Sequence, residues 1–412
     1  MTMERSDVLV VGAGPVGLLA ALILSRRGVK VTVIEQHHQV VDSPRACVYL
    51  PQTLMSLEEA GILDEVRKRG LISREGLAFR SAKDDVVLAQ LDGSVLGPED
   101  MPPPEYRYAV LLGQHLLCDI ILEKLKERKV AVHFDTAFNM LEDDEKCVKV
   151  IATCRNETTV FHATYLLGCD GARSSVRKQL GVEFEGFTHD IIFMAVNFRY
   201  AHILDSGFCS GQFLIDPKKD QVDTDFAVLV RTGTDDVWRC AYGDSGTLSE
   251  EELMARMPGR LKRILPLHPD PEQVEILRAQ PYKVHQRAAA TFVKDNVLLA
   301  GDAAHVNNPL GGMGLCTGIL DAHVAALAIE NAVKNGDQAK SIAFEKYNKD
   351  RRAAFLEMTN PISIQNLRLV CEESEEADKL RAGFFGGLNS IPEFQRNIQL
   401  HVNKMALGVP GF

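Results

Sequence analysis

One stretch near the N-terminus constrains the fold more than any other. A Gly-Ala-Gly-Pro-Val-Gly run at residues 12–17 lies between a short apolar segment, residues 7–11, and a helical pattern, residues 18–27. Residues 29–34 have the composition of a second buried strand, and Glu35 closes that strand. Strand, glycine turn, helix and strand in this order form a βαβ unit. The sequence therefore predicts a parallel sheet with a nucleotide bound at the edge where the strands end.

Each residue type in this unit has a physical reason. Gly12 permits the tight turn, Gly14 lets the backbone approach a pyrophosphate because it has no Cβ, and Gly17 lets the helix pack closely on the strand. The free N–H groups at the start of the helix would face the phosphates. Glu35 can accept hydrogen bonds from a ribose diol. The unit predicts a dinucleotide, and it leaves open whether that is FAD or NAD.

The bulk composition excludes several classes of protein. The 412 residues carry a net charge of −10, so we expect no nucleic-acid partner. Nine cysteines are spread singly without a CxxC pair, which favours reduced thiols in a cytoplasmic protein and argues against a metal site. Residues 8–24 are apolar, but glycines and a proline interrupt them, so we expect no membrane span.

A second strand-turn-helix pattern lies near residue 170. Residues 165–169 are mostly apolar and lead into Asp170-Gly171, which predicts a turn. Ser174 or Ser175 can cap the helix that follows. Taken alone, this pattern is also compatible with an ordinary turn into a helix.

The third pattern lies near residue 300. Residues 297–300 form an apolar run that ends in Gly301-Asp302. A Pro-Leu-Gly-Gly-Met-Gly loop at residues 309–314 then leads into an alanine-rich helical pattern over residues 319–333. A carboxylate after a strand, followed by a glycine-rich loop before a helix, is typical of ligand binding at a helix N-terminus.

Between the second and third patterns, the alternation of strands and helices is lost. Strand-like runs occupy residues 191–200, 211–215, 225–230 and 237–242. Two helical patterns follow, near residues 250–257 and around Arg260. These runs predict an antiparallel sheet inserted into the nucleotide-binding domain. The predicted domains are a discontinuous nucleotide-binding domain (1–72, 105–186 and 288–355), a substrate domain (73–104 and 187–287) and a C-terminal helical segment (356–412).

The three patterns, in this order and spacing, resemble the single-component FAD-dependent aromatic hydroxylases, of which p-hydroxybenzoate hydroxylase is the archetype. Arg45-Ala46 and Gly113-Gln114 also match, and the resemblance covers roughly residues 5–355. One residue departs from the common pattern, since Cys316 lies where many members have asparagine. The resemblance implies an α/β fold with a Rossmann-like FAD-binding domain, an inserted mixed or antiparallel β-sheet substrate domain and a C-terminal helical segment.

The resemblance also implies the site residues. Glu35 would bind the adenosine ribose, Arg45 and Gln114 would approach the pyrophosphate and ribityl chain, and Asp302 would bind the ribityl chain. Read alone, Arg45 could equally be a surface arginine and Gln114 a capping amide. The residues implied to bind FAD are Gly12, Gly14, Pro15, Val16, Gly17, Glu35, Arg45, Ala46, Gln114, Asp170, Gly301, Asp302, Pro309, Gly311, Gly312, Met313, Gly314 and Leu315.

The implied reaction inserts one oxygen atom of O2 into an aromatic, phenolic or polyketide-like small molecule, by hydroxylation or epoxidation through a flavin hydroperoxide. NADH or NADPH would reduce the FAD, and the single dinucleotide fingerprint fits a reductant that visits briefly. A flavin oxidase or dehydrogenase on the same fold is the alternative, and a flavin-binding protein without turnover is a third reading. A homodimer is a further family expectation.

A phenol reacts more readily when it is ionised, so a base or a cation is expected beside it. The candidates are Arg199, Arg231, His189, His285 and, in the loop along the flavin, Pro309. Each arginine or histidine in a sheet could instead be a structural partner. We expect His305 to hold the loop by hydrogen bonding.

Overall fold

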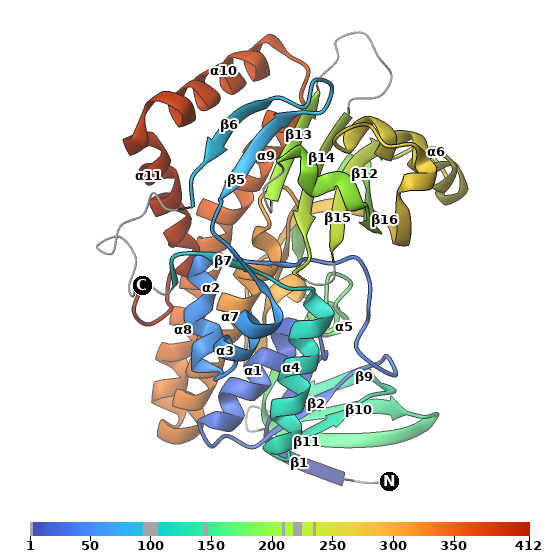
Figure 1. The fold of residues 1–412 in the computed structure, drawn as a ribbon. Coiled ribbons are helices and arrows are strands. Elements are labelled where there is room, and N and C mark those ends of the chain that lie inside the picture. The colour runs from blue at the N-terminus through green and yellow to red at the C-terminus, as the bar shows by residue number, and fades with distance from the viewer. Residues whose placement is uncertain (1–2, 94–105, 144–146, 208–210, 217–224, 234–235) are drawn as a thin grey trace.

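The computed structural model describes the chain except for residues 1–2, 94–105, 144–146, 208–210, 217–224 and 234–235 (Figure 1). Two eight-stranded sheets lie one above the other in this view, and a three-stranded sheet lies between them. The small sheet consists of β3 (Val48–Tyr49), β4 (Leu71–Ser73) and β7 (Ala109–Leu111). This mixed α/β architecture confirms the predicted fold class.

The first large sheet is parallel through its centre and to one edge, and antiparallel strands are added at its other edge and on a side branch. Its strands are β1 (Met3–Val11), β2 (Val31–Ile34), β8 (Ala131–His133), β9 (Thr136–Asp143), β10 (Val148–Cys154), β11 (Glu157–Gly168), β17 (Val293–Lys294) and β18 (Val297–Leu299). β1 pairs in parallel with β2 and β11, and β11 pairs in parallel with β18. The three predicted strand-turn patterns follow β1, β11 and β18. Because these strands are parallel neighbours, their carboxyl ends meet at one edge.

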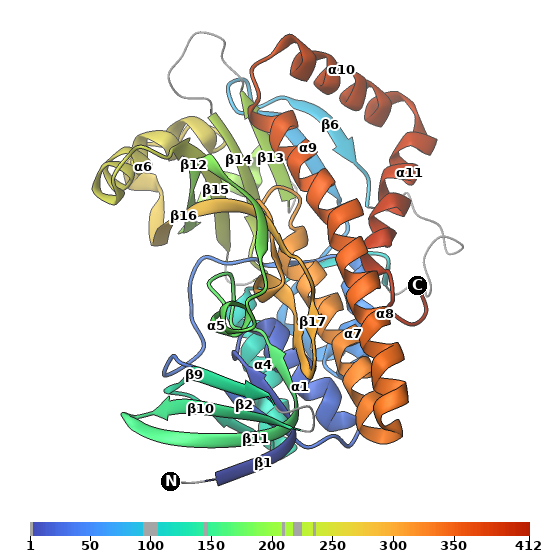
Figure 2. The ribbon, with the colours of Figure 1, turned by 180° about the vertical axis from the view of Figure 1, so that it is seen from behind.

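Helices cover this sheet and complete its core. They are α1 (Pro15–Arg26), α2 (Pro51–Glu59), α3 (Leu63–Arg69), α4 (Gln114–Glu127), α5 (Ser175–Gln179), α7 (Met313–Asn335) and α8 (Asp337–Ala354). α1 packs against α4 and α7, and α8 lies along α7 (Figure 2). Among the described residues, α7 alone is long and apolar enough to cross a membrane, but 83% of its most apolar stretch is buried inside the protein.

The second large sheet is antiparallel except for one pairing. Its strands are β5 (Leu77–Ser81), β6 (Val87–Leu91), β12 (Phe184–Arg199), β13 (Gly211–Asp216), β14 (Asp225–Arg231), β15 (Val237–Ser245), β16 (Glu275–Ala289) and β19 (His305–Val306). β5 pairs with β13 in parallel. The two separate segments predicted for the substrate domain, 73–104 and 187–287, therefore contribute strands to a single sheet. β16 was not among the strand-like runs that the sequence indicated. The domain boundaries themselves stay a prediction.

The segments between the strands differ from the sequence expectations at two places. The two helical patterns near residue 250 form one helix, α6 (Glu250–Ile264), which continues through Pro258 and begins with a capping box at Ser249. α7 begins at Met313 rather than near residue 319, because Gly312 at the helix start adopts a φ of 65° and turns the loop directly into the helix. Three short 3₁₀ turns complete these connections, at Ala201–Ser206, Pro271–Gln273 and Gly301–Ala303.

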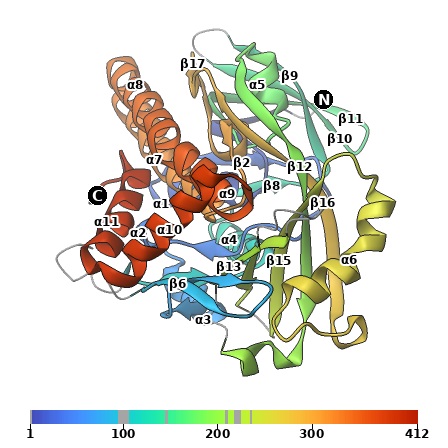
Figure 3. The ribbon, with the colours of Figure 1, turned by 90° about the horizontal axis from the view of Figure 1, so that it is seen from above.

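The C-terminal segment is helical, as expected, and covers part of one face of the second sheet. A π-helical turn (Phe355–Thr359) joins α8 to α9 (Asn360–Cys371), and α10 (Glu375–Ser390), α11 (Pro392–Val402) and a short turn (Asn403–Ala406) follow. α9 contacts β13 and β14, and α10 contacts β6. Seen from above, these helices lie on the side of the sheet opposite α6 (Figure 3).

Candidate active site

A large cavity, about 1890 Å³ in volume, lies where the strand ends of the first sheet, one face of the second sheet and the C-terminal helices meet. Drug-sized ligands occupy pockets of roughly 300–1,000 Å³, so this cavity has room for a cofactor together with a smaller molecule. Of the residues implied to bind FAD, all except Gly17 line it. The structure therefore brings together positions that are as far apart in the sequence as Gly12 and Leu315.

The first glycine turn shows why each glycine is there. Gly12 has a φ of 109°, and a Cβ on it would lie 2.4 Å from the carbonyl oxygen of Cys169. A Cβ on Gly17 would lie 2.1 Å from the carbonyl oxygen of Gly12. A Cβ on Gly14 would meet no protein atom within 4 Å, so the space beside this glycine is free for a ligand. The turn thus fits a dinucleotide phosphate at the N-terminus of α1.

Glu35 closes the same turn from the end of β2. Its carboxylate accepts hydrogen bonds from the backbone N–H of Ala13 at 2.8 Å and of His37 at 2.9 Å. Each carboxylate oxygen can accept a second hydrogen bond. Glu35 therefore shapes the turn and still has capacity for a ribose diol.

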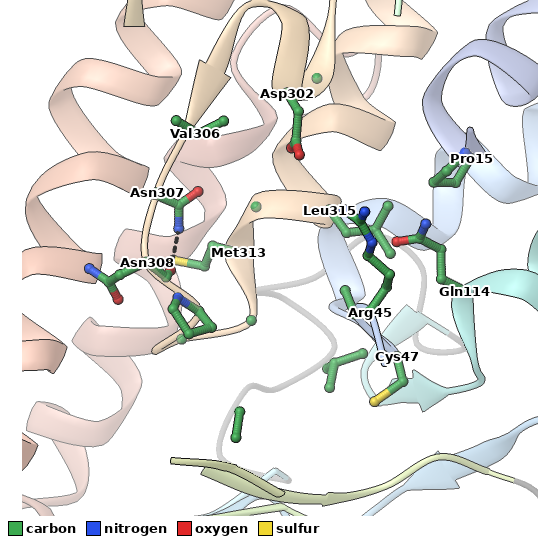
Figure 4. A pocket seen from close by; sticks show the side chains of 18 of the residues that line it. Pro15, Arg45, Cys47, Gln114, Asp302, Val306, Asn307, Asn308, Met313 and Leu315 are labelled. Carbon is green, nitrogen blue, oxygen red and sulfur yellow. Dashed lines mark hydrogen bonds between the residues drawn. The ribbon is translucent and has the colours of Figure 1, made fainter. Parts of the chain in front are cut away.

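Arg45 and Gln114 line the cavity on the side of Pro15, as Figure 4 shows. The Nε of Arg45 donates to the hydroxyl of Ser43 at 3.1 Å, which holds the guanidinium in place. Gln114 is the first residue of α4. Both side chains are polar groups of the kind that suits a phosphate and a ribityl hydroxyl.

Asp170 accepts hydrogen bonds at the start of the short helix α5, whose N-cap is Ser174. Its carboxylate accepts hydrogen bonds from the Ser174 hydroxyl at 2.5 Å and from the backbone N–H groups of Ser175 and Val176 at 2.7 and 3.1 Å. Arg177, on the same helix, donates to the carbonyl oxygen of Ala303 at 2.7 Å. The Asp-Gly turn is thereby fastened to the Gly-Asp turn.

Asp302 points into the cavity (Figure 4). Its side chain borders the cavity and is otherwise surrounded by protein. Burial raises the pKa of the carboxyl above its usual value, and the positive charge of Arg45 partly offsets this rise. The preceding residue, Gly301, adopts a φ of 61° and lies against Val16 of α1. The two strand-turn motifs therefore meet, with Asp302 at the junction.

A fully buried carboxylate that the sequence did not indicate holds this turn. Asp321 of α7 accepts hydrogen bonds from the backbone N–H of Gly301 at 3.1 Å and from Nε of Arg351 at 2.8 Å. Nε2 of His305 lies 2.7 Å from the same carboxylate. The expected loop-holding role of His305 is confirmed by this contact. No local pattern could have revealed Asp321, because its partners come from distant segments.

Hydrogen bonds of Asn308 hold the loop before α7 in place. The side-chain amide of Asn308 donates to Gln286 at 3.2 Å and to the carbonyl oxygen of Ser363 at 2.9 Å, and its oxygen accepts from the backbone of Leu310 at 3.0 Å. Helix α7 begins after this loop without a side-chain cap. Its first N–H groups have no partner inside the helix, so they give the adjoining part of the cavity a positive potential.

Cys316 is buried at the end of the first turn of α7. Its thiol donates to the carbonyl oxygen of Val48 at 3.3 Å, and burial raises its pKa to about 12. The thiol is therefore a packing contact between α7 and the small sheet, and it is protonated at neutral pH.

The second sheet supplies the remaining wall. Its inward-facing side chains are mostly apolar and include Ala195, Val228, Val230 and Ala241. Arg239 and Tyr282 line the cavity among them. Sequence reasoning missed Arg239. The signal that could have indicated it is the alternation along the strand. Arg239 lies between Trp238 and Cys240, and these two residues and Tyr242 are fully buried.

The structure places some of the predicted catalytic candidates at the cavity and others away from it. Arg199 and Arg231 do not line the cavity; they lie in solvent-accessible ion pairs with Glu275 and Asp236, both at 3.3 Å, at the ends of β12 and β14. His189 also lies outside the lining.

His285 and Pro309 do line the cavity. Nδ1 of His285 lies 2.9 Å from the hydroxyl of Thr188. Burial, helped by Arg287 and Lys283, lowers the pKa of His285 below 6.5, so its imidazole is neutral at neutral pH.

Comparison with known proteins agrees with this geometry. A family model described as an FAD binding domain matches residues 5–360. The chain is 38% identical over 381 residues to para-nitrophenol 4-monooxygenase of Pseudomonas sp. strain WBC-3, covering 92% of this chain and 91% of the relative. It is 32% identical over 370 residues to 6-hydroxy-3-succinoylpyridine 3-monooxygenase of Pseudomonas putida, covering 89% of each.

A crystal structure of p-nitrophenol 4-monooxygenase from Pseudomonas putida DLL-E4 matches with a TM-score of 0.90 and 35% identity, covering 99% of both chains. The fold and these matches define a flavoprotein monooxygenase that binds FAD. The chain belongs to the FAD-dependent aromatic hydroxylases. It is an oxidoreductase whose substrates are aromatic small molecules.

Proposed function

We propose that this enzyme uses NADH or NADPH together with O2 to hydroxylate a phenol with a single ring. The observation that carries the proposal is the continuity of the cavity, in which the FAD-binding turns open directly onto the apolar face of the second sheet. The names of two relatives, which act on p-nitrophenol and on a hydroxylated pyridine, support this substrate class.

The described residues fit FAD, because the space beside Gly14 is open and the two polar turns face it. We assign the adenosine ribose to Glu35, the pyrophosphate to Arg45 and the ribityl chain to Asp302. Bound FAD supplies the redox chemistry that activates O2. The N-terminus of α7, from Met313 to Leu315, would stabilise negative charge on the group beside it.

The apolar wall would keep water away from the reacting centre, which protects reactive intermediates from hydrolysis. His285 is neutral and lines the cavity, and we propose that it accepts the proton of the phenol. A contribution of Pro309 to positioning the flavin stays a prediction.

The test is a turnover assay on the purified flavoprotein. NADH and NADPH oxidation is followed with a panel of phenols under ¹⁸O2, and the product is analysed by mass spectrometry. One labelled oxygen atom in a hydroxylated product is the expected result. Turnover that yields an oxidised product without labelled oxygen would instead identify an oxidase or dehydrogenase.

Two further properties belong to this proposal. We infer a cytoplasmic location, which the free thiols of the eight cysteines in the described residues support. We also infer a homodimer, which light scattering on the purified protein would test against a monomer.

A further inference from the structure

Arg239 is buried in the wall of the cavity with part of its guanidinium unused. It lies on β15 opposite Asn197 of β12 and Val230 of β14, and only 6% of its surface is exposed. Its Nε donates to the side-chain oxygen of Asn197 at 2.9 Å. Its Nη1 is buried and has no hydrogen-bond partner among the described residues. Within the same residues, no carboxylate lies within ion-pair distance of it.

Two other buried arginines of this chain have partners for both terminal nitrogens of the guanidinium. Arg351 is paired with Asp321 and also donates to the backbone carbonyls of Met405 and Leu407. Arg177 donates to two backbone carbonyls and packs against an aromatic ring. Burying a guanidinium without an anion costs several kcal/mol, so a partly unsatisfied guanidinium in the wall of a cavity favours a ligand that supplies the missing charge.

The surroundings of Arg239 add to this argument. Arg45 and Arg239 both act on the pKa of Tyr282, where burial is the largest influence and raises it, while the two guanidinium groups lower it. The same wall contains the apolar side chains of Val230 and Ala241. An aromatic ring fits against such a surface, and the positive charge selects rings that carry a negatively charged oxygen.

We propose that Arg239 binds the negatively charged oxygen of the aromatic substrate and that Asn197 positions its guanidinium for this contact. The proposal rests on the proposed function, because it assumes that the substrate lies against the second sheet. The oxygen can belong to a phenolate or to a ring carboxylate, and both present the same charge to the guanidinium. Arg239 would thus make the site prefer the ionised form of a single-ring substrate over its neutral analogue.

The test measures binding to the oxidised holoenzyme, without reductant and therefore without turnover. Flavin difference spectra report the dissociation constants of two ligand pairs that differ mainly in charge. 4-Nitrophenol and 4-nitroanisole probe the phenolate, and 4-methoxybenzoate and 4-methoxybenzamide probe the carboxylate. Wild-type protein, Arg239→Gln and Arg239→Lys are compared, with Arg231→Gln as the control because Arg231 lies on the neighbouring strand outside the cavity.

We expect Arg239→Gln to weaken binding of at least one charged ligand by roughly 10- to 100-fold, the value of a charge-assisted hydrogen bond, and to leave its neutral partner almost unchanged. Arg239→Lys should retain part of the affinity, and Arg231→Gln all of it. The charged ligand that loses affinity identifies the source of the oxygen. Equal effects on charged and neutral ligands, or no effect on either, would overturn the proposal.

The experiment still tests the proposal if one variant loses FAD, and it does not depend on the turnover assay. If Arg239→Gln fails to retain FAD, the wild type and Arg239→Lys still give an answer, because the wild type must bind at least one charged ligand more tightly than its neutral partner and Arg239→Lys must lose part of that preference. A wild-type protein that binds the neutral member of each pair as tightly as the charged member overturns the proposal. The binding measurements do not depend on oxygen insertion in the ¹⁸O2 assay. The proposed hydroxylation and the proposed role of Arg239 can therefore be refuted independently of each other.

Discussion

Asp321 and Arg351 form an ion pair that is completely buried, with 2.8 Å between the Oδ1 of Asp321 and the Nε of Arg351. Through this pair, α7 is joined to α8, and Arg351 continues to the backbone carbonyls of Met405 and Leu407 near the C-terminus. The other oxygen of Asp321 holds the N–H of Gly301, next to Asp302. The position of the FAD-binding turn therefore depends on residues from three distant segments.

Replacing Asp321 with Asn should destabilise the protein strongly. The amide would leave the guanidinium of Arg351 buried without a counter-charge, which typically costs about 3–5 kcal/mol. Urea unfolding of the FAD-free protein would measure this loss. Glu142→Gln is the matched control, because it breaks an ion pair with Lys149 that is exposed to solvent and contributes at most ~1 kcal/mol. Equal stabilities of the two variants would contradict the role given to Asp321.

Two glycine substitutions should separate folding from cofactor binding. Gly17→Ala places a methyl group 2.1 Å from the carbonyl oxygen of Gly12, so it should prevent normal folding. Gly14 has an ordinary φ of −74° and open space beside it, so Gly14→Ala should fold with a near-normal Tm. It should nevertheless weaken FAD binding, because the new methyl group occupies space next to the phosphates. A Gly14→Ala protein with unchanged FAD affinity would argue against this phosphate site.

Asp302→Ala should lose FAD without losing the fold. The carboxyl faces the cavity and accepts no hydrogen bond from any described residue, so its removal disturbs little protein structure. We expect the dissociation constant for FAD to rise by roughly 10- to 100-fold, as for the loss of a charge-assisted hydrogen bond. Fluorescence titration of the FAD-free protein measures this, and thermal unfolding checks the fold. Retention of FAD with normal turnover would be inconsistent with a ribityl contact.

His323 should make stability depend on pH. Burial lowers its pKa from 6.5 to about 4, and its Nδ1 lies 2.9 Å from the hydroxyl of Ser56. Below pH 6.5 the unfolded chain binds a proton that the folded protein does not bind until about pH 4, so this residue's contribution to stability is present above pH 6.5 and declines as the pH falls. The decline amounts to roughly 3 kcal/mol.

Urea unfolding of wild-type protein and His323→Gln, repeated between pH 7 and pH 4, would isolate this contribution. The unfolding free energy of the variant should fall less over that range than that of the wild type. Parallel curves for the two proteins would show that His323 does not titrate as its burial indicates.

The catalytic candidates show where sequence reasoning reached its limit. Arg199, Arg231 and Arg239 are all arginines in strands of one sheet, and the sequence singled out the first two. Pairing of β14 with β15 places Arg231 opposite Trp238, whose side chain packs in the core, whereas Arg239 lies one residue further along β15 on the cavity side. Because neighbouring residues of a strand point to opposite faces, a shift of one residue decides which arginine lines the cavity.

The sequence by itself determined the three strand-turn motifs, their order and the class of cofactor they hold. Those signals are local, because a glycine turn and a buried strand depend on a few consecutive residues. Only the tertiary structure decided that Asp321 supports the turn at Gly301, that Asn197 orients Arg239 and that α7 begins at Met313. These contacts join residues that are far apart in the chain, or depend on the exact pairing of strands, and no local pattern encodes them.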